Sequence, residues 1–181
     1  HELHVNMPPH SGNYLYPNEN TIYASRPRII FRVGSSESSN LTAYINLNGV
    51  SYNSSTNSSC FNKTSYRSDD YVVFAPTTEL LEGSNRISMK TYDGIDYSSE
   101  IISTINYNNP LTTRIAEGTN EYISAARYDY LKEMINSTIR AYGEYDLCSY
   151  DVTINKTPIK NYYWLDLYNK ILNINKKIKD R

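Results

Sequence analysis

Residue combinations that carry out chemistry are scarce in this chain of 181 residues. Its three histidines, His1, His4 and His10, lie in the first ten residues, far along the sequence from both cysteines. A nucleophilic serine or cysteine needs an adjacent base, so this distribution disfavours a hydrolase of that kind. The histidine spacing also differs from the H-E-x-x-H zinc motif. We therefore predict that the protein is not an enzyme and holds no metal and no cofactor.

Glycine, net charge and long apolar runs are also lacking. The chain has seven glycines and no glycine-rich phosphate loop, which disfavours a nucleotide site. Its formal net charge is −1 at pH 7, too small to draw the protein to nucleic acid or to an anionic membrane. No run approaches the roughly 18 apolar residues that a membrane-spanning helix needs. We predict neither nucleic-acid binding nor membrane insertion.

Only two cysteines are present, Cys60 and Cys148, and neither belongs to a C-x-x-C pair. A zinc site or a thioredoxin-type redox site is therefore not expected. Small secreted folds that depend on disulfides carry more cysteines than this. We predict two free thiols, and a single bridge between two domains stays open as the alternative.

Paired carboxylates are the remaining candidates for chemistry. Asp69 and Asp70 are adjacent, and Asp93 lies near Asp96 with Gly94 between them. Such pairs can serve a glycosidase, and oxygen-rich turns of sandwich domains can bind calcium. Aspartate in turns also bonds to its own backbone, and we prefer this interpretation for both pairs.

Short alternating runs dominate residues 20–108. Asn48-Gly49 and Asp93-Gly94 punctuate them, as is typical of hairpins in a β-sandwich. Strands are predicted at 28–33, 41–47, 50–52, 71–74, 85–92 and 100–107, so we expect about seven in all. Residues 1–19 have no periodicity and are predicted to form an extended arm.

Residues 110–181 follow a helical pattern instead. One helix of about 20 residues is predicted from an N-cap at Asn120 to Gly143, and a second from Thr157 with Pro158 in its first position. Aligning the two caps gives a faint repeat with an offset of 37. The second helix carries an apolar stripe at steps of three and four, which predicts packing along a partner in an assembly. The stripe consists of Trp164, Leu167, Ile171, Ile174 and Ile178.

Two stretches carry family resemblances. Residues 80–90 (LLEGSNRISMK), followed by Asp93-Gly94, resemble the penultimate-strand region of bacterial immunoglobulin-like modules, which occur in surface proteins and on phage virions. Residues 157–160 (TPIK) and 164–167 (WLDL) resemble small helical modules of phage and secreted proteins of Gram-positive bacteria. The resemblances imply an α+β chain of separate modules: an immunoglobulin-like antiparallel β-sandwich followed by a two-helix α-helical connector. The β region departs from antibody-type domains because it has no tryptophan and no cysteine pair.

Candidate binding residues come from tyrosines and from a polar loop. The chain has 19 tyrosines, and tyrosine is the residue that binding surfaces use most readily. Residues 53–59 are almost entirely Asn, Ser and Thr, which is typical of an exposed loop. Ordinary sheet positions are the simpler explanation for any one tyrosine. The candidates are Tyr52, Asn53, Asn57, Tyr66 and Tyr97, with Tyr44 a further tyrosine near a turn.

The first functional hypothesis is a non-enzymatic structural or attachment component of a phage virion or phage-tail-like particle from a low-GC, Gram-positive host. The alternative is a secreted or wall-attached bacterial adhesion module that binds glycan or host protein through loops of the β region. A third possibility is an accessory domain of a larger hydrolase. The first two place the chain in a virion or at the cell surface, with other protein subunits as partners in an oligomeric assembly.

Overall fold

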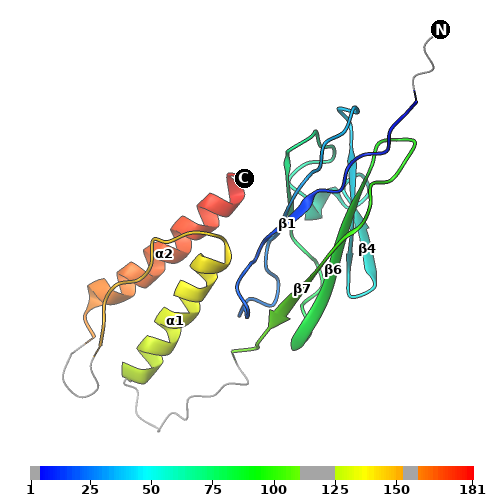
Figure 1. Cartoon of the computed structure of the whole chain (residues 1–181). Coiled ribbons are helices and arrows are strands. Elements are labelled where there is room, and N and C mark those ends of the chain that lie inside the picture. The colour runs from blue at the N-terminus through cyan, green and yellow to red at the C-terminus, as the bar shows by residue number, and fades with distance from the viewer. Residues whose placement is uncertain (1–4, 111–124, 153–158) are drawn as a thin grey trace. The chain divides into compact units, whose positions relative to one another are not determined.

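The chain divides into two compact units, which are described separately. The computed structural model describes residues 5–110, 125–152 and 159–181. The β unit comprises His1–Pro17 and Ser25–Tyr107, and the helical unit comprises Asn18–Ala24 and Asn108–Arg181. Figure 1 shows the strands of the first and the two helices of the second. The α+β composition predicted from the sequence is therefore confirmed.

Seven strands form two antiparallel sheets in the β unit. The first sheet has the order β1-β2-β5, with bounds Asn13–Tyr16, Ile29–Arg32 and Tyr71–Phe74. The second has the order β4-β3-β6-β7, with bounds Val50–Asn53, Thr42–Leu47, Gly83–Tyr92 and Ile101–Tyr107.

The core of the β unit lies between the two sheets. In β3 the residues alternate strictly between buried and half-buried, so one face of the second sheet is apolar and the other is polar. The rings of Tyr52 in β4 and Phe74 in β5 join the sheets at a centroid distance of 4.9 Å. The polar outer face of the second sheet is consequently the surface on which the candidate site is built.

The β3–β4 hairpin has the predicted turn. Asn48 and Gly49 both have positive φ, 51° and 89°, as a two-residue type I′ connection requires. The register follows from this turn, because Leu47 pairs with Val50 and Ile45 with Tyr52.

Strand β1 was not predicted, because its residues fall in the expected extended arm. Asn13–Tyr16 pairs antiparallel with β2, and the pairing shifts register after Tyr14. Two glycines permit the close approach: a Cβ on Gly12 would lie 1.8 Å from the Arg32 carbonyl oxygen, and one on Gly34 would lie 2.2 Å from that of His10. Most of the described arm is therefore part of the β unit.

A buried asparagine organises the start of β6. Asn85 has no exposed surface, yet its amide nitrogen donates to the carbonyl oxygens of Leu81, Gly83 and Ile105 at 2.8, 3.0 and 3.3 Å. Its amide oxygen accepts from the Leu81 N–H at 2.8 Å and from the Asn48 side chain at 2.7 Å. A buried polar group is tolerated when it is fully hydrogen-bonded, and here it ties two turns together.

The helical unit contains α1, Ala125–Ala141, and α2, Asn161–Lys179. Gly143 follows α1 with φ 71°, as predicted for its end. The segment Asn18–Ala24 belongs to this unit: the Asn18 N–H donates to the Ala141 carbonyl at 2.7 Å, and Glu19 lies 3.7 Å from Arg140. No helix in the described part of the chain is long and apolar enough to cross a membrane.

The predicted start of the second helix is wrong. Lys160 has the extended values φ −90° and ψ 157°, and α2 begins only at Asn161. The preference of proline for a first helical position is only a local signal. In the first turn of α2, the ring of Tyr163 stacks on that of Tyr150 at 4.7 Å. The expected caps Asn120 and Thr157, Pro158 and therefore the repeat built on the caps lie outside the described residues.

The core of the helical unit contains an aromatic cluster. Its buried members are Tyr128, Cys148, Val152, Tyr163 and Leu167. Further buried residues of this unit include Ile139, Tyr142, Ile174 and Ile178. Burial raises the pKa of the Cys148 thiol to about 11 and that of the Tyr128 hydroxyl to about 12. Both groups are therefore neutral at physiological pH, as an apolar core requires.

Candidate functional site

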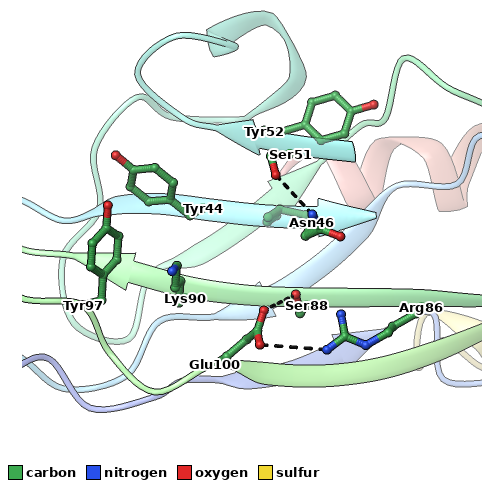
Figure 2. A pocket seen from close by; sticks show the side chains of 10 residues that line it. Tyr44, Asn46, Ser51, Tyr52, Arg86, Ser88, Lys90, Tyr97 and Glu100 are labelled. Atoms are coloured by element: carbon green, nitrogen blue, oxygen red, sulfur yellow. Dashed lines mark hydrogen bonds and ion pairs between the residues drawn. The ribbon is translucent and has the colours of Figure 1, made fainter. Parts of the chain in front are cut away.

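An open groove of about 370 Å³ lies on the polar outer face of the second sheet (Figure 2). The register explains how its side chains come together: Tyr44 is opposite Lys90, and Asn46 is opposite both Ser88 and Ser51. Glu100 lies immediately before β7, and Tyr97 comes from the turn that follows β6. The polar and aromatic residues that line the groove are Tyr44, Asn46, Ser51, Tyr52, Arg86, Ser88, Lys90, Tyr97 and Glu100.

One end of the groove is aromatic. The rings of Tyr44 and Tyr97 are 5.4 Å apart at an interplanar angle of 73°, which makes a corner, and Tyr92 supports Tyr97 from 4.6 Å. The Lys90 ammonium lies 4.3 Å from the centroid of the Tyr97 ring. Tyr97 remains 46% exposed. This end therefore offers aromatic surface and a positive charge side by side.

The Tyr44 hydroxyl at the aromatic end is neutral at physiological pH. Burial raises the pKa of Tyr44 above its ordinary value, and the hydrogen bond with Tyr97 raises it further. The Tyr44 hydroxyl can consequently donate and accept hydrogen bonds without titrating.

The other end of the groove is polar. The Ser88 hydroxyl donates to the Glu100 carboxylate at 2.6 Å, and Arg86 lies 3.9 Å from the same carboxylate. Asn46 donates to the Ser51 hydroxyl at 3.1 Å. These groups can exchange their mutual hydrogen bonds for bonds to a polar ligand.

Of the tyrosines predicted to bind, only Tyr97 is well exposed. Tyr52 is 5% and Tyr66 1% exposed, so both side chains are largely buried, although Tyr52 is among the residues that line the groove. The Tyr66 hydroxyl donates to Asn62 at 2.9 Å, and burial raises its pKa far above the usual value. Both residues remain predictions as binding residues. Their burial follows from strand register, which closeness to a turn in the sequence does not indicate.

The predicted polar loop is held together by its own asparagines. The Asn53 amide oxygen accepts from the backbone N–H of Ser55 and Thr56 at 3.1 and 2.9 Å, and that of Asn57 accepts from the Asn53 N–H at 2.9 Å. A short 3₁₀ turn, Ser58–Cys60, follows. The two candidate amides therefore have structural hydrogen bonds in place.

The carboxylate of Asp93 forms the predicted turn. It accepts from the backbone N–H of Ile95 at 2.8 Å and of Asp96 at 2.7 Å, and these bonds hold its pKa below the ordinary value. Asp70 likewise accepts from the Arg67 N–H at 3.0 Å. Within residues 5–110, 125–152 and 159–181, no group of three or more histidine, cysteine or acidic side chains is placed to hold a metal ion.

The predicted stripe of α2 divides between two environments. Leu167, Ile174 and Ile178 are buried inside the helical unit, and Trp164 packs edge-on against Tyr128 at 5.4 Å. Most of this stripe thus serves the unit's own core and is not available to another subunit. Ile171 of the stripe is 41% exposed. Three further apolar residues of α2 are exposed between 48% and 58%: Leu165, Tyr168 and Leu172.

Lys90, Arg86 and Glu100 are the charged groove residues that the sequence analysis missed. The predicted hairpin and the alternation in 85–92 place Arg86, Ser88 and Lys90 on one face, so this much was readable. The contact of Lys90 with Tyr97 depends on the turn between β6 and β7, and nothing in the local sequence indicates it.

No family model and no curated protein matches the sequence. Two solved structures are similar over 55% of this chain. An endo-beta-1,4-mannanase from Thermotoga petrophila has 6% identity and a TM-score of 0.42, and 20% of its chain is covered. A cell-surface-expressed multi-modular chitinase from Paenibacillus sp. str. FPU-7 has 16% identity and a TM-score of 0.37, with 9% covered. The chain therefore spans a fifth or less of these proteins, and similarity at this level assigns no family.

Proposed function

We propose that the β unit binds a carbohydrate in the groove and that the protein acts as a non-catalytic attachment module. The observation that carries the proposal is the corner formed by Tyr44 and Tyr97 next to hydrogen-bonding groups on one exposed sheet face. A sugar ring has C–H faces that pack on aromatic rings, and hydroxyls that need donors and acceptors. The groove offers both, and its volume falls within the usual range of ligand sites.

The acid content of the groove favours binding over hydrolysis. Glycoside hydrolysis ordinarily requires two carboxylates on either side of the scissile bond. Glu100 is the only carboxylate among the residues that line the groove, and Ser88 already donates to it.

The strand order supports the proposal that the β unit is an immunoglobulin-like module. In constant-type immunoglobulin domains the first, second, fifth and fourth strands form one sheet and the remaining three form the other. Here the fourth strand pairs with the third instead, which gives sheets of three and four strands. Related modules on phage virions and bacterial surfaces serve attachment, which fits both predicted locations.

A second candidate function is assembly into a larger particle through the helical unit. The exposed apolar residues Leu165, Tyr168 and Leu172 favour it, because they are spaced by three and four along α2 and leave about half of each side chain in water. On this proposal the helical unit connects the binding module to other protein subunits of a virion or cell wall.

Carbohydrate binding is tested on a printed panel of neutral and acidic oligosaccharides. The wild-type protein is compared with Tyr97→Ala and with the matched control Tyr71→Ala, which removes a tyrosine of similar exposure, 40%, from β5 in the other sheet. We expect Tyr97→Ala to weaken binding about tenfold or more, equivalent to about 1.4 kcal/mol. Tyr71→Ala should leave it unchanged.

Two results would contradict the proposal. One is the absence of binding to any saccharide on the panel. The other is equal loss in both variants, which would place the binding surface elsewhere. Circular dichroism of each variant shows whether the fold is intact.

A further inference from the structure

The charges in the groove do not balance. Arg86 and Lys90 are positive, and Glu100 is the only acid. The carboxylate of Glu100 lies 3.9 Å from Arg86 and accepts the Ser88 hydroxyl at 2.6 Å. Within the described part of the chain, no ion pair joins Lys90 to an acid. One positive charge is therefore left for a ligand.

Lys90 occupies the place where a sugar would stack. Its ammonium lies 4.3 Å from the centroid of the Tyr97 ring. The centroid of the Tyr92 ring lies 4.6 Å from that of the Tyr97 ring. Tyr97 can offer its ring to a ligand only if the ammonium moves aside. What draws the ammonium away therefore decides which ligand binds.

An anionic ligand is favoured by the relative strengths of a cation–π contact and of a hydrogen bond between charged groups. An ammonium over an exposed aromatic ring gains about 0.5–1 kcal/mol. A hydrogen bond to a charged group contributes about 1.5–3 kcal/mol. A carboxylate on the ligand can consequently draw Lys90 off the ring at a net gain. The hydroxyls of a neutral sugar can also accept from the ammonium, but they lack the opposite charge that strengthens the bond.

We propose that the groove selects an acidic saccharide, and this inference rests on the proposed carbohydrate-binding function. A uronic or sialic acid residue places its carboxylate on the Lys90 ammonium, and a sugar ring packs in the corner of Tyr44 and Tyr97. Lys90 thereby determines specificity, while the tyrosines supply contact area that neutral and acidic sugars share.

The experiment measures affinity by titration calorimetry for two matched pairs of ligands. Tri-galacturonate is compared with its methyl ester, which has the same rings without the charge, and sialyllactose is compared with lactose. We expect the acid of at least one pair to bind about tenfold more tightly than its neutral partner, and the preference to shrink as salt is added. Preference in the first pair indicates a uronate within a chain, and in the second a terminal sialate.

Three variants assign the preference to Lys90. Lys90→Met keeps the unbranched stem and should lower the affinity for the acid to that of the neutral partner. Lys90→Arg keeps the charge and should retain most of the preference. The control Lys63→Met removes a lysine that is paired with Asp70 at 2.9 Å outside the groove, and should change nothing. Thermal unfolding checks that each variant is folded.

The failures of the two proposals are distinguishable. Equal affinity for acid and neutral partner, both weakened by Tyr97→Ala, would overturn the selection of acids and leave carbohydrate binding intact. A preference for the acid that survives in Lys90→Met would overturn the role of Lys90. Binding to none of the four saccharides and to none on the printed panel would overturn both proposals.

Discussion

The two units use a similar buried asparagine to hold a loop, but they differ in the other interactions that connect their segments. Each contains one buried asparagine that holds a loop: Asn85 in the β unit, and Asn136, whose amide bonds to both the N–H and the carbonyl of Cys148. Their other connections differ. The β unit is closed by backbone ladders between strands, whereas charged side chains of the helical unit reach across it to the segment after α1.

Because of this difference, we expect salt and pH to affect the interactions of the two units unequally. Lys170 lies 2.5 Å from Asp146, and Lys177 lies 2.8 Å from Glu144, so the helical unit depends in part on interactions that salt and pH weaken. Backbone hydrogen bonds within a sheet respond little to either. The sheet that carries the groove is joined by such backbone ladders, so we expect salt and pH to affect it less than they affect these ion pairs.

The largest effect is expected from Leu167→Ala in the helical unit. Leu167 is 4% exposed in the aromatic core, and its truncation should lower the free energy of unfolding by about 3 kcal/mol. Leu165→Ala, two positions earlier and 56% exposed, is the matched control and should change it by less than about 0.5 kcal/mol. Urea unfolding is followed by the fluorescence of Trp164, the single tryptophan. Equal destabilisation would show that the exposed face of α2 is also packed in solution.

Asn85→Ala should have the next largest effect, this time in the β unit. It leaves buried hydrogen-bonding groups around the start of β6 without partners, at a cost of about 2 kcal/mol. Thr104→Ala, on the exposed face of β7, is the control and should be neutral. Amide hydrogen exchange at Leu81 reports the loss directly. Unchanged protection there would mean that the amide network is dispensable.

The smallest effect is expected from Asp146→Asn. The hydrogen bond from Lys170 lowers the pKa of Asp146, and the same contact raises the pKa of Lys170. Stability from the lowered carboxyl pKa is present above its unfolded value and is lost as pH falls through the folded value. Stability from the raised lysine pKa is lost as pH rises through its folded value.

The variant should therefore be weaker by about 0.5 kcal/mol at pH 7 and low salt, as is usual for an exposed pair. The difference should shrink as pH falls through the lowered pKa of Asp146 and the carboxyl becomes protonated, and also at high salt. Urea unfolding at several pH values measures it. A difference that persisted under acid conditions would attribute the effect to the Asn173 contact instead.

Local chemistry explains which parts of the fold were predictable. Asn48-Gly49 and the Asp93 turn were read correctly, because positive φ and side-chain to backbone bonds are set within four residues. Strand β1 was missed, because its pairing depends on Gly12 meeting a strand some twenty residues away. The start of α2 was misplaced because the preference of proline for a first helical position is only a local signal, and Lys160 is extended.

The candidate site was less predictable than the fold. Tyr97 was identified, but Tyr52 and Tyr66 were not distinguished from it, because the sequence does not indicate which tyrosines the opposite sheet covers. Lys90 and Glu100 carry no motif. Their place in the groove follows only from the fold, because β6 and the turn before β7 bring them beside Tyr97 and Ser88.

The short segment Asn18–Ala24 belongs to the helical unit although it lies between two parts of the β unit in the sequence. The two units are therefore not two continuous stretches of the chain. The chain crosses from one unit to the other three times, after Pro17, Ala24 and Tyr107. A single proteolytic cut after β7 therefore does not produce one fragment for each unit. The N-terminal fragment would keep residues that bond to Ala141 and Arg140, so the two pieces would stay together as a nicked protein.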